Sequence, residues 1–175
     1  SSLILSAQSV HFHAPVDIPI QFTGSFGELR GTHFHSGIDI RTNGQIGLPL
    51  YSAESGHVSR VSVSPTGFGL ALYIAHHNGY TTVYGHMDRF APRIAEWVKA
   101  QQYQKKRFAL DVELSPEILP VEKGEMIGWS GNSGSSGGPH LHYEIRNTQT
   151  NRSLNPGFFG FQAADTKSPV FNFVH

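Results

Sequence analysis

The chain contains no cysteine and no long apolar run. The lack of cysteine excludes disulfides, thiolate metal sites and cysteine nucleophiles from its 175 residues. No stretch approaches the roughly 18 apolar residues of a membrane-spanning helix, so we expect no transmembrane segment in this chain. Charged residues are also scarce, at 15%, and 13 basic residues balance 13 acidic ones. This balance gives no electrostatic reason to expect nucleic acid or an anionic membrane as a partner.

Glycine, proline and histidine are plentiful instead. The chain has 19 glycines, 10 prolines and 11 histidines, a mix typical of a turn-rich β domain. Several segments alternate apolar and polar residues, and Asn78-Gly79 separates two of them as a hairpin turn would. The length suits one ordinary domain with a real core. We therefore expect a mainly β fold, a compact antiparallel β-sheet domain.

One segment departs from this β pattern. Residues 90–106 carry larger side chains at helical spacing: Phe90, Ile94, Trp97, Val98 and Gln101. Pro92 fits the first turn of a helix, where its missing N–H is not needed. The sequence therefore predicts one amphipathic helix near 91–106, with Phe90 and Trp97 in its buried stripe, followed by a loop over 111–120.

The segment THFHSGIDI, residues 32–40, offers His35 and Asp39 as metal ligands. In a regular strand the two would lie about 13 Å apart at about 3.3 Å per residue. That is too far for one ion with bonds of about 2 Å. We therefore expect a sharp bend at Ser36-Gly37, where glycine relaxes the steric limit on φ. His33 shares a strand face with His35; we expect it in a groove wall, with metal ligation as the alternative.

The segment GGPHLHYEI, residues 137–145, places His140 and His142 on the same face of a strand. At about 6.5 to 7 Å apart they suit one metal ligand and one neighbouring catalytic group better than two ligands of one ion. Gly137 and Gly138 precede them and would let a mobile loop approach a substrate closely.

His86, in TTVYGHM, is a further candidate at the end of the second hairpin strand. It would enter the same cleft if that strand lay near His140 and His142. A His-Asp-His ligand set with an open fourth position is typical of catalytic zinc, although such ligands accept other divalent ions. A single carboxylate leaves the complex positively charged, which suits polarising a carbonyl.

Other side chains near these motifs are expected to have roles other than metal binding. Tyr143 is a candidate for the substrate groove, together with His33, Gly137 and Gly138. Glu144 is expected on the strand face opposite His142, in a structural role. His76 and His77 flank the Asn-Gly turn and are expected to face solvent. The loop GNSGSSGG lacks the lysine and following helix of a phosphate-binding loop, so no nucleotide is expected.

Taken together, HFHSGID, GLPLYSAESGHVSRV, VYGHM and GNSGSSGGPHLHYEIR resemble the lysostaphin-type (LytM-domain) zinc metallopeptidases. The resemblance covers residues 26–156. It implies one zinc ion held by His35, Asp39 and His142, and it implies His86 and His140 as catalytic histidines.

The resemblance also implies a fold, a reaction and a location. The fold would be of the duplicated-hybrid-motif kind, with a groove across one sheet. The reaction would be cleavage of peptidoglycan peptides outside the cytoplasm, in the periplasm, cell envelope or medium. We divide the chain into an N-terminal strand region (1–25), a metallopeptidase domain (26–160) and a tail (161–175) that begins a further unit. An insertion at 87–121 separates this chain from compact members of the family.

Two other functions compete with the peptidase. One is a non-catalytic relative that binds the cell wall or activates a partner enzyme; against it, all the matched ligands and both catalytic histidines are present. The other is a cupin-like metal protein, suggested by the H-x-H followed by an acid in HFHSGID. The late H-x-H of residues 140–142 fits the peptidase better.

Overall fold

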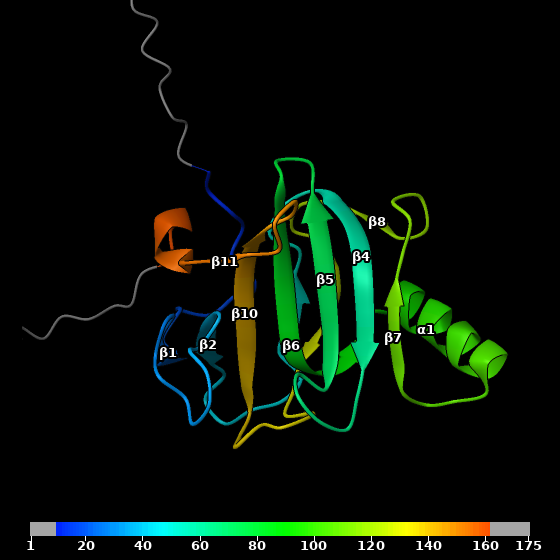
Figure 1. The fold of residues 1–175 in the computed structure, drawn as a ribbon, viewed down its shortest axis with the longest axis horizontal. Helices are drawn as coiled ribbons and strands as arrows, with labels where there is room; N and C mark the ends of the chain where they lie inside the picture. Colours follow the sequence, from blue (N-terminus) through cyan, green and yellow to red (C-terminus); the bar gives the residue numbers. More distant parts are fainter. Residues whose placement is uncertain (1–9, 162–175) are drawn as a thin grey trace, which may run out of the picture.

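One antiparallel β-sheet dominates the computed structural model, which describes residues 10–161 (Figure 1). The expected mainly β fold is confirmed. The main path through this sheet of 11 strands runs β1-β2-β10-β6-β5-β4-β7. Its strands are β1 (Phe22–Gly24), β2 (Ile38–Arg41), β3 (Pro49–Tyr51), β4 (Gly56–Val63), β5 (Leu70–His76), β6 (Tyr80–Phe90), β7 (Leu110–Glu113), β8 (Pro120–Val121), β9 (Met126–Ser130), β10 (His140–Asn147) and β11 (Ser153–Leu154). A 3-10 turn, η1 (Pro156–Phe159), follows.

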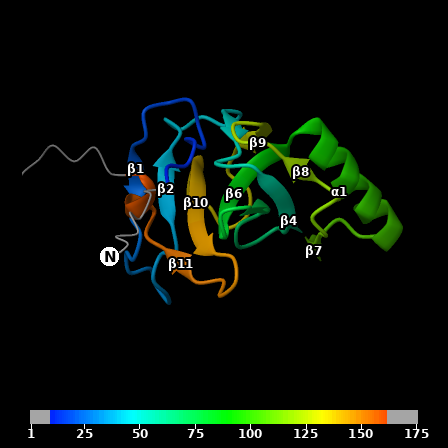
Figure 2. The ribbon, with the colours of Figure 1, turned by 90° about the horizontal axis from the view of Figure 1, so that it is seen from above.

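The centre of the sheet is formed by β10, β6, β5 and β4. The β5–β6 hairpin turns at the predicted Asn78-Gly79, where Gly79 has a φ of 84°. β6 is long enough to pair with β10 and β5 and, near its end, with β9. Figure 2 shows β9 behind the main path. Ile127 of β9 belongs to the larger apolar core. Alternate residues of each central strand enter that core, and the others face the opposite side of the sheet.

The predicted helix is present as α1 (Pro92–Lys105), with proline in its first turn. Ile94 and Val98 are its buried residues, whereas Phe90 is the buried last residue of β6 rather than part of the helix. Trp97 is partly buried and packs against the core. Figure 1 shows α1 beyond β7, at the opposite end of the molecule from β1 and β2.

The prediction of a loop over residues 111–120 is partly wrong. β7 overlaps the start of this range and pairs with β4, and β8 pairs with the start of β4. Leu110 enters the core with only 3% of its surface exposed. These short strands complete hydrogen bonds along an edge of β4 that would otherwise be open.

The N-terminal strand expected before residue 25 is shorter than its alternating pattern indicated. Only Phe22–Gly24 form a strand, β1, which pairs with β2. The prolines upstream lack the N–H that a ladder needs. The further unit expected from residue 161 onward falls almost wholly outside the described residues. Within the described part, no helix is long and apolar enough to cross a membrane.

Candidate metal centre and active site

Strand pairing brings the predicted metal ligands together. His142 of β10 lies directly opposite Asp39 of β2 in the antiparallel register, and opposite Gly85 of β6 on its other side. Two residues separate His35 from the start of β2, and the chain bends there so that His35 lies over the same face. His35 Nε2, Asp39 Oδ1 and His142 Nδ1 form a triangle with edges of 3.1, 3.0 and 3.1 Å.

This triangle fits one tetrahedral ion. Bonds of about 2.0–2.1 Å at tetrahedral angles place neighbouring ligand atoms about 3.3 Å apart, close to the observed edges. Within residues 10–161, His35, Asp39 and His142 have ligand atoms close enough together to hold one metal ion, and all three side chains are buried. All three are at most 6% exposed, and the sequence offers no thiolate to compete with them.

Each of four histidines has one ring nitrogen fixed by an oxygen that can only accept a hydrogen bond. His35 Nδ1 donates to Ser25 O at 2.9 Å, and His142 Nε2 donates to Glu144 Oε1 at 2.8 Å. His86 Nδ1 donates to Ser133 O and His140 Nδ1 to Gly138 O, both at 2.8 Å. A neutral imidazole carries a single N–H, so the other nitrogen of each ring bears a lone pair. For His35 and His142 that nitrogen points into the ligand triangle.

The carboxyl group of Asp39 stays ionised. Burial alone would raise the pKa of its carboxyl group, but the hydrogen bonds that His140, His142 and His35 donate in their protonated forms, together with the one from Arg30, outweigh burial and hold the pKa well below its usual range. Arg30 Nη2 lies 2.8 Å from Asp39 Oδ2, so it binds the oxygen that faces away from the triangle. Lone pairs and a fixed negative charge that converge within about 3 Å repel one another unless a cation lies between them. The donor set therefore fits a divalent metal.

His86 occupies a strained position beside the triangle. Its backbone φ is 58°, in the left-handed region that a non-glycine residue rarely adopts. Burial lowers the pKa of His86 to about 4, so the ring is neutral at pH 7. Its ring centroid lies 4.7 Å from that of His140.

His140 lies on the other side of the same opening. Burial lowers its pKa, but the hydrogen bonds that the protonated ring makes to Asp39 and to the Gly138 carbonyl raise it more, and the net shift is upward. His140 Nε2 is 3.4 Å from Asp39 Oδ1 and thus lies beside the ligand atoms without belonging to the tight triangle. The division of His140 and His142 into neighbour and ligand stays a prediction.

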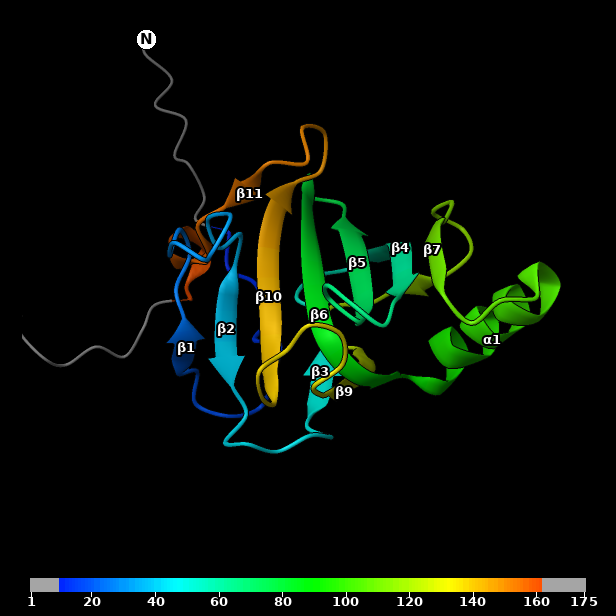
Figure 3. The same ribbon diagram turned by 60° about the horizontal axis from the view of Figure 1, so that its bottom comes forward.

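An open cleft of about 430 Å³ surrounds these side chains. It is lined by the five predicted metal and catalytic residues and by Arg30, His33, Phe68 and residues of the loop 135–137, including Gly137. That loop is tied to the β4–β5 turn, since Gly67 N donates to Ser135 Oγ and Ser135 N donates to Gly67 O. The two loops lie side by side in Figure 3. The cleft wall is therefore anchored, although a mobile loop was expected there.

The four residues expected to line the substrate groove do not all lie in the cleft. His33 and Gly137 line the cleft, whereas Gly138 contributes its carbonyl to His140. The groove role expected for Tyr143 is wrong, because its side chain is fully buried against Tyr84. Tyr143 follows His142 by one residue and so faces the opposite side of β10, into the core.

The bend at Ser36-Gly37 is present, but its physical reason differs from the expected one. Gly37 has no positive φ. A Cβ at this position would instead lie 2.3 Å from Tyr143 O and 2.8 Å from Glu144 Cγ. Glycine is needed here so that the loop can press against β10, which sets the distance between His35 and His142.

Two functional neighbours were missed or misplaced. Glu144 does not point away from His142; residues two apart in a strand share a face, and Glu144 contacts His142 directly. Strand parity, applied correctly, would have found this contact. Phe68 stacks on the His142 ring at a centroid distance of 4.6 Å. No signal in the sequence pointed to Phe68, which comes from a separate turn.

His76 is buried rather than solvent-facing. It is 5% exposed, and its Nε2 lies 2.7 Å from Thr82 Oγ1. His76 shares a strand face with Leu72 and Ile74, so its side chain enters the core beside Phe12. His77 is exposed, as expected.

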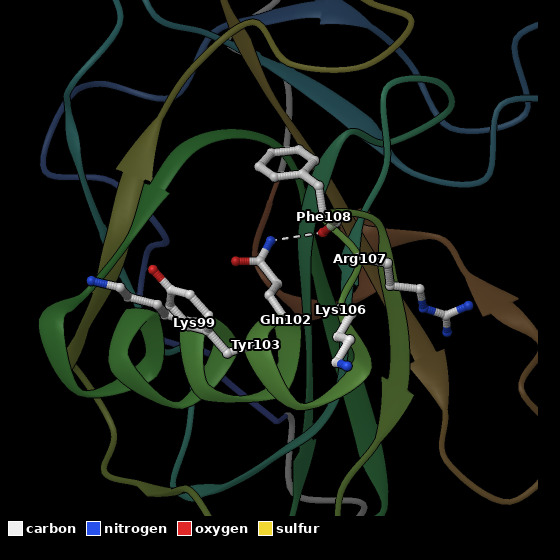
Figure 4. Close-up of a pocket in the computed structure, with 6 residues that line it drawn as sticks. All are labelled: Lys99, Gln102, Tyr103, Lys106, Arg107 and Phe108. Atoms are coloured by element: carbon white, nitrogen blue, oxygen red, sulfur yellow. Dashed lines mark hydrogen bonds between the residues drawn. The ribbon is translucent and has the colours of Figure 1, made fainter.

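A larger hollow, of about 710 Å³, lies on α1 and the segment after it (Figure 4). Lysine, arginine, glutamine and two exposed aromatic side chains line it, and Gln102 Nε2 donates to Phe108 O at 2.7 Å across it. None of its lining residues is a histidine or an acid, so the hollow lacks the usual ligands of a zinc ion.

Comparison with known proteins identifies relatives that match most of this chain. An uncharacterized metalloprotease of Haemophilus influenzae is 33% identical over 122 residues, which are 70% of this chain and 20% of that protein. The peptidoglycan DD-endopeptidase ShyA of Vibrio cholerae is 32% identical over 111 residues, or 63% of this chain and 20% of ShyA. The solved structure of a zinc-containing peptidase from Vibrio cholerae, 28% identical, has a TM-score of 0.58 and covers 81% of this chain and 37% of that one. The chain spans about a fifth of the length of the curated relatives.

The family model for peptidase family M23 matches residues 33–103 and 113–156. These ranges are most of the chain and contain all five predicted metal and catalytic residues. The unmatched residues 104–112 cover the end of α1 and the start of β7. The resemblance to lysostaphin-type metallopeptidases is thereby confirmed at the level of the family. The chain belongs to peptidase family M23.

Proposed function

We propose that this protein is a zinc-dependent metalloendopeptidase that hydrolyses peptide bonds of bacterial peptidoglycan. The observation that carries the proposal is the ligand triangle of His35, Asp39 and His142, with two further histidines beside it in an open cleft. Three protein ligands leave a coordination position for water or substrate, as in catalytic zinc sites. Zinc bound there would polarise the scissile carbonyl and lower the pKa of its water toward about 7.

The chain's own residues then manage the protons. We assign His140 as general base, because its Nε2 carries the lone pair and lies beside Asp39 Oδ1. The proton removed from the attacking water passes to the leaving amine nitrogen, as the hydroxyl oxygen bonds to the carbonyl carbon and the C–N bond breaks. We assign His86 to this return step, supported by its ring contact with His140. The Gly138 carbonyl, which accepts from His140 Nδ1, stabilises the ring while it is protonated.

The substrate and location follow from the relatives and from the shape of the cleft. ShyA is named a peptidoglycan DD-endopeptidase, and 111 residues of this chain align with it. An open cleft admits a peptide strand more readily than a closed cavity does. We therefore propose peptidoglycan stem or cross-link peptides as the substrate, and an extracytoplasmic site of action.

The test is cleavage of purified peptidoglycan by the zinc-loaded protein, with released peptides identified by mass spectrometry. New amino and carboxyl ends at one type of peptide bond are expected, and none with His140→Ala. His77→Ala serves as the matched control, because His77 is exposed and outside the cleft. A protein that holds zinc but releases no peptide from any peptidoglycan would contradict the proposal and favour a wall-binding role.

A further inference from the structure

Glu144 is a fully buried carboxylate directly behind the metal centre. It is 0% exposed and shares the cleft-side face of β10 with His142. Burying a carboxylate is costly unless donors surround it. Glu144 has three: Ser36 Oγ and His142 Nε2 donate to Oε1, and Arg146 Nε donates to Oε2.

These contacts determine which nitrogen of His142 can bind a metal. A carboxylate oxygen accepts and cannot donate, so the proton of a neutral His142 ring is held on Nε2. Nδ1 then carries the lone pair, and it is Nδ1 that lies 3.0 Å from Asp39 Oδ1 and 3.1 Å from His35 Nε2. With the proton on Nδ1 instead, His142 would turn an N–H toward the place where a metal must bind.

The position of Glu144 is itself fixed from two directions. Arg146 holds one carboxylate oxygen at 2.6 Å from the same strand. Ser36 approaches the other oxygen from the loop that carries His35, and the missing Cβ of Gly37 leaves room for Glu144 Cγ. The loop before β2 and strand β10 are thus joined through this carboxylate.

We propose that Glu144 is a positioning residue that sets the tautomer and ring orientation of His142 for zinc, with Ser36 and Arg146 holding it in place. The proposal rests on the proposed function, because it requires that His142 bind the metal. Partners of this kind behind metal-binding histidines change metal affinity by about 10–100-fold when they are removed. A purely structural ion pair with Arg146 would leave zinc affinity unchanged.

The test compares zinc dissociation constants at pH 7, measured by competition with a chromophoric chelator on metal-free protein. In Glu144→Gln the amide has one acceptor and one donor group, so it cannot accept from Ser36, His142 and Arg146 together. We expect zinc to bind about 10–100-fold more weakly, with Ser36→Ala showing a smaller loss. Asp111→Asn is the matched control, because it breaks an exposed carboxylate–arginine pair with Arg60, away from the cleft.

A second measurement uses the unaltered protein, in case Glu144→Gln does not fold. Nitrogen-15 NMR of the zinc-loaded protein should show His142 with Nε2 protonated and Nδ1 bound to metal. Protonated Nδ1, or unchanged zinc affinity in folded Glu144→Gln, would overturn the proposal. If the wild-type protein binds no zinc, it is the proposed function that fails.

Discussion

His142 and Asp39 lie directly opposite each other on β10 and β2, although 103 residues separate them in the chain. Their ring nitrogen and carboxylate oxygen are 3.0 Å apart because the two strands pair in this register. A slip of one residue would turn His142 to the core face of the sheet. The metal centre is therefore a consequence of strand pairing, and features that hold β2 against β10 should control metal binding as strongly as the ligands do.

Gly37→Ala is predicted to damage both the fold and the metal centre. The new Cβ would lie 2.3 Å from the Tyr143 carbonyl oxygen, which belongs to the backbone and cannot easily move. We expect a loss of about 1–3 kcal/mol in the free energy of unfolding, measured by chemical denaturation, and weaker zinc binding. Gly31→Ala is the matched control, because a Cβ there meets nothing within 4 Å. Equal stability of the two variants would show that Gly37 is not packed as described.

His86 and His140 are predicted to be needed for hydrolysis but not for metal binding. His140→Ala and His86→Ala should keep one zinc per chain by elemental analysis, because the ligand triangle is intact without them. Peptide release should fall by at least about 100-fold in each, the usual contribution of a general acid or base. A zinc-free His140→Ala protein would instead make His140 a ligand and would refute the division of roles between His140 and His142.

His76 is predicted to make the fold sensitive to mild acid. Burial lowers its pKa to about 4 in the folded protein, against about 6.5 in an unfolded chain. Above pH 6.5 the ring is neutral in both states and adds no pH dependence. As pH falls from about 6.5 to about 4, the unfolded state takes up a proton that the folded state does not, so stability falls by about 3 kcal/mol and then levels off.

The measurement for His76 is the free energy of unfolding between pH 4 and 7, for the wild type and for His76→Gln. Other buried groups also respond to acid, so the difference between the two proteins isolates His76. The variant should lose less stability on acidification. Parallel curves for the two proteins would mean that His76 is not buried as a neutral ring.

Ile94 is predicted to hold α1 on the sheet without affecting the chemistry. It is 1% exposed, and Ile94→Ala should cost about 2–5 kcal/mol while zinc stoichiometry remains unchanged. Ile46→Ala makes the same chemical change at a side chain that is 58% exposed, and should stay within about 0.5 kcal/mol of the wild type. Loss of zinc in a folded Ile94→Ala protein would connect α1 to the metal centre, contrary to this account.

Most of the fold prediction rested on the spacing of apolar residues along the sequence. Alternating apolar residues and the Asn78-Gly79 turn gave the central hairpin, and Pro92 with Ile94 and Val98 gave α1. β7 was missed because a short edge strand is stabilised by its partner β4 more than by its own pattern. Propensity contributes little where tertiary pairing decides the structure.

The site was predictable where spacing constrained it. Two histidines one residue apart must share a strand face, and His35 and Asp39 can meet only across a bend. The hydrogen bonds from three histidine rings to the backbone carbonyls of Ser25, Gly138 and Ser133 could not be predicted from the sequence, because any residue type supplies a backbone carbonyl. By contrast, the burial of His76 could have been predicted, because His76 shares a strand face with the apolar Leu72 and Ile74.

Crystallography at the zinc absorption edge can show whether His35, Asp39 and His142 hold one zinc ion. We expect one anomalous peak per chain, bonded to His35 Nε2, Asp39 Oδ1 and His142 Nδ1 at about 2.0–2.2 Å. His140 and His86 should lie outside bonding distance of the peak. A peak bonded to His140 or His86, or no peak after zinc loading, would contradict the account.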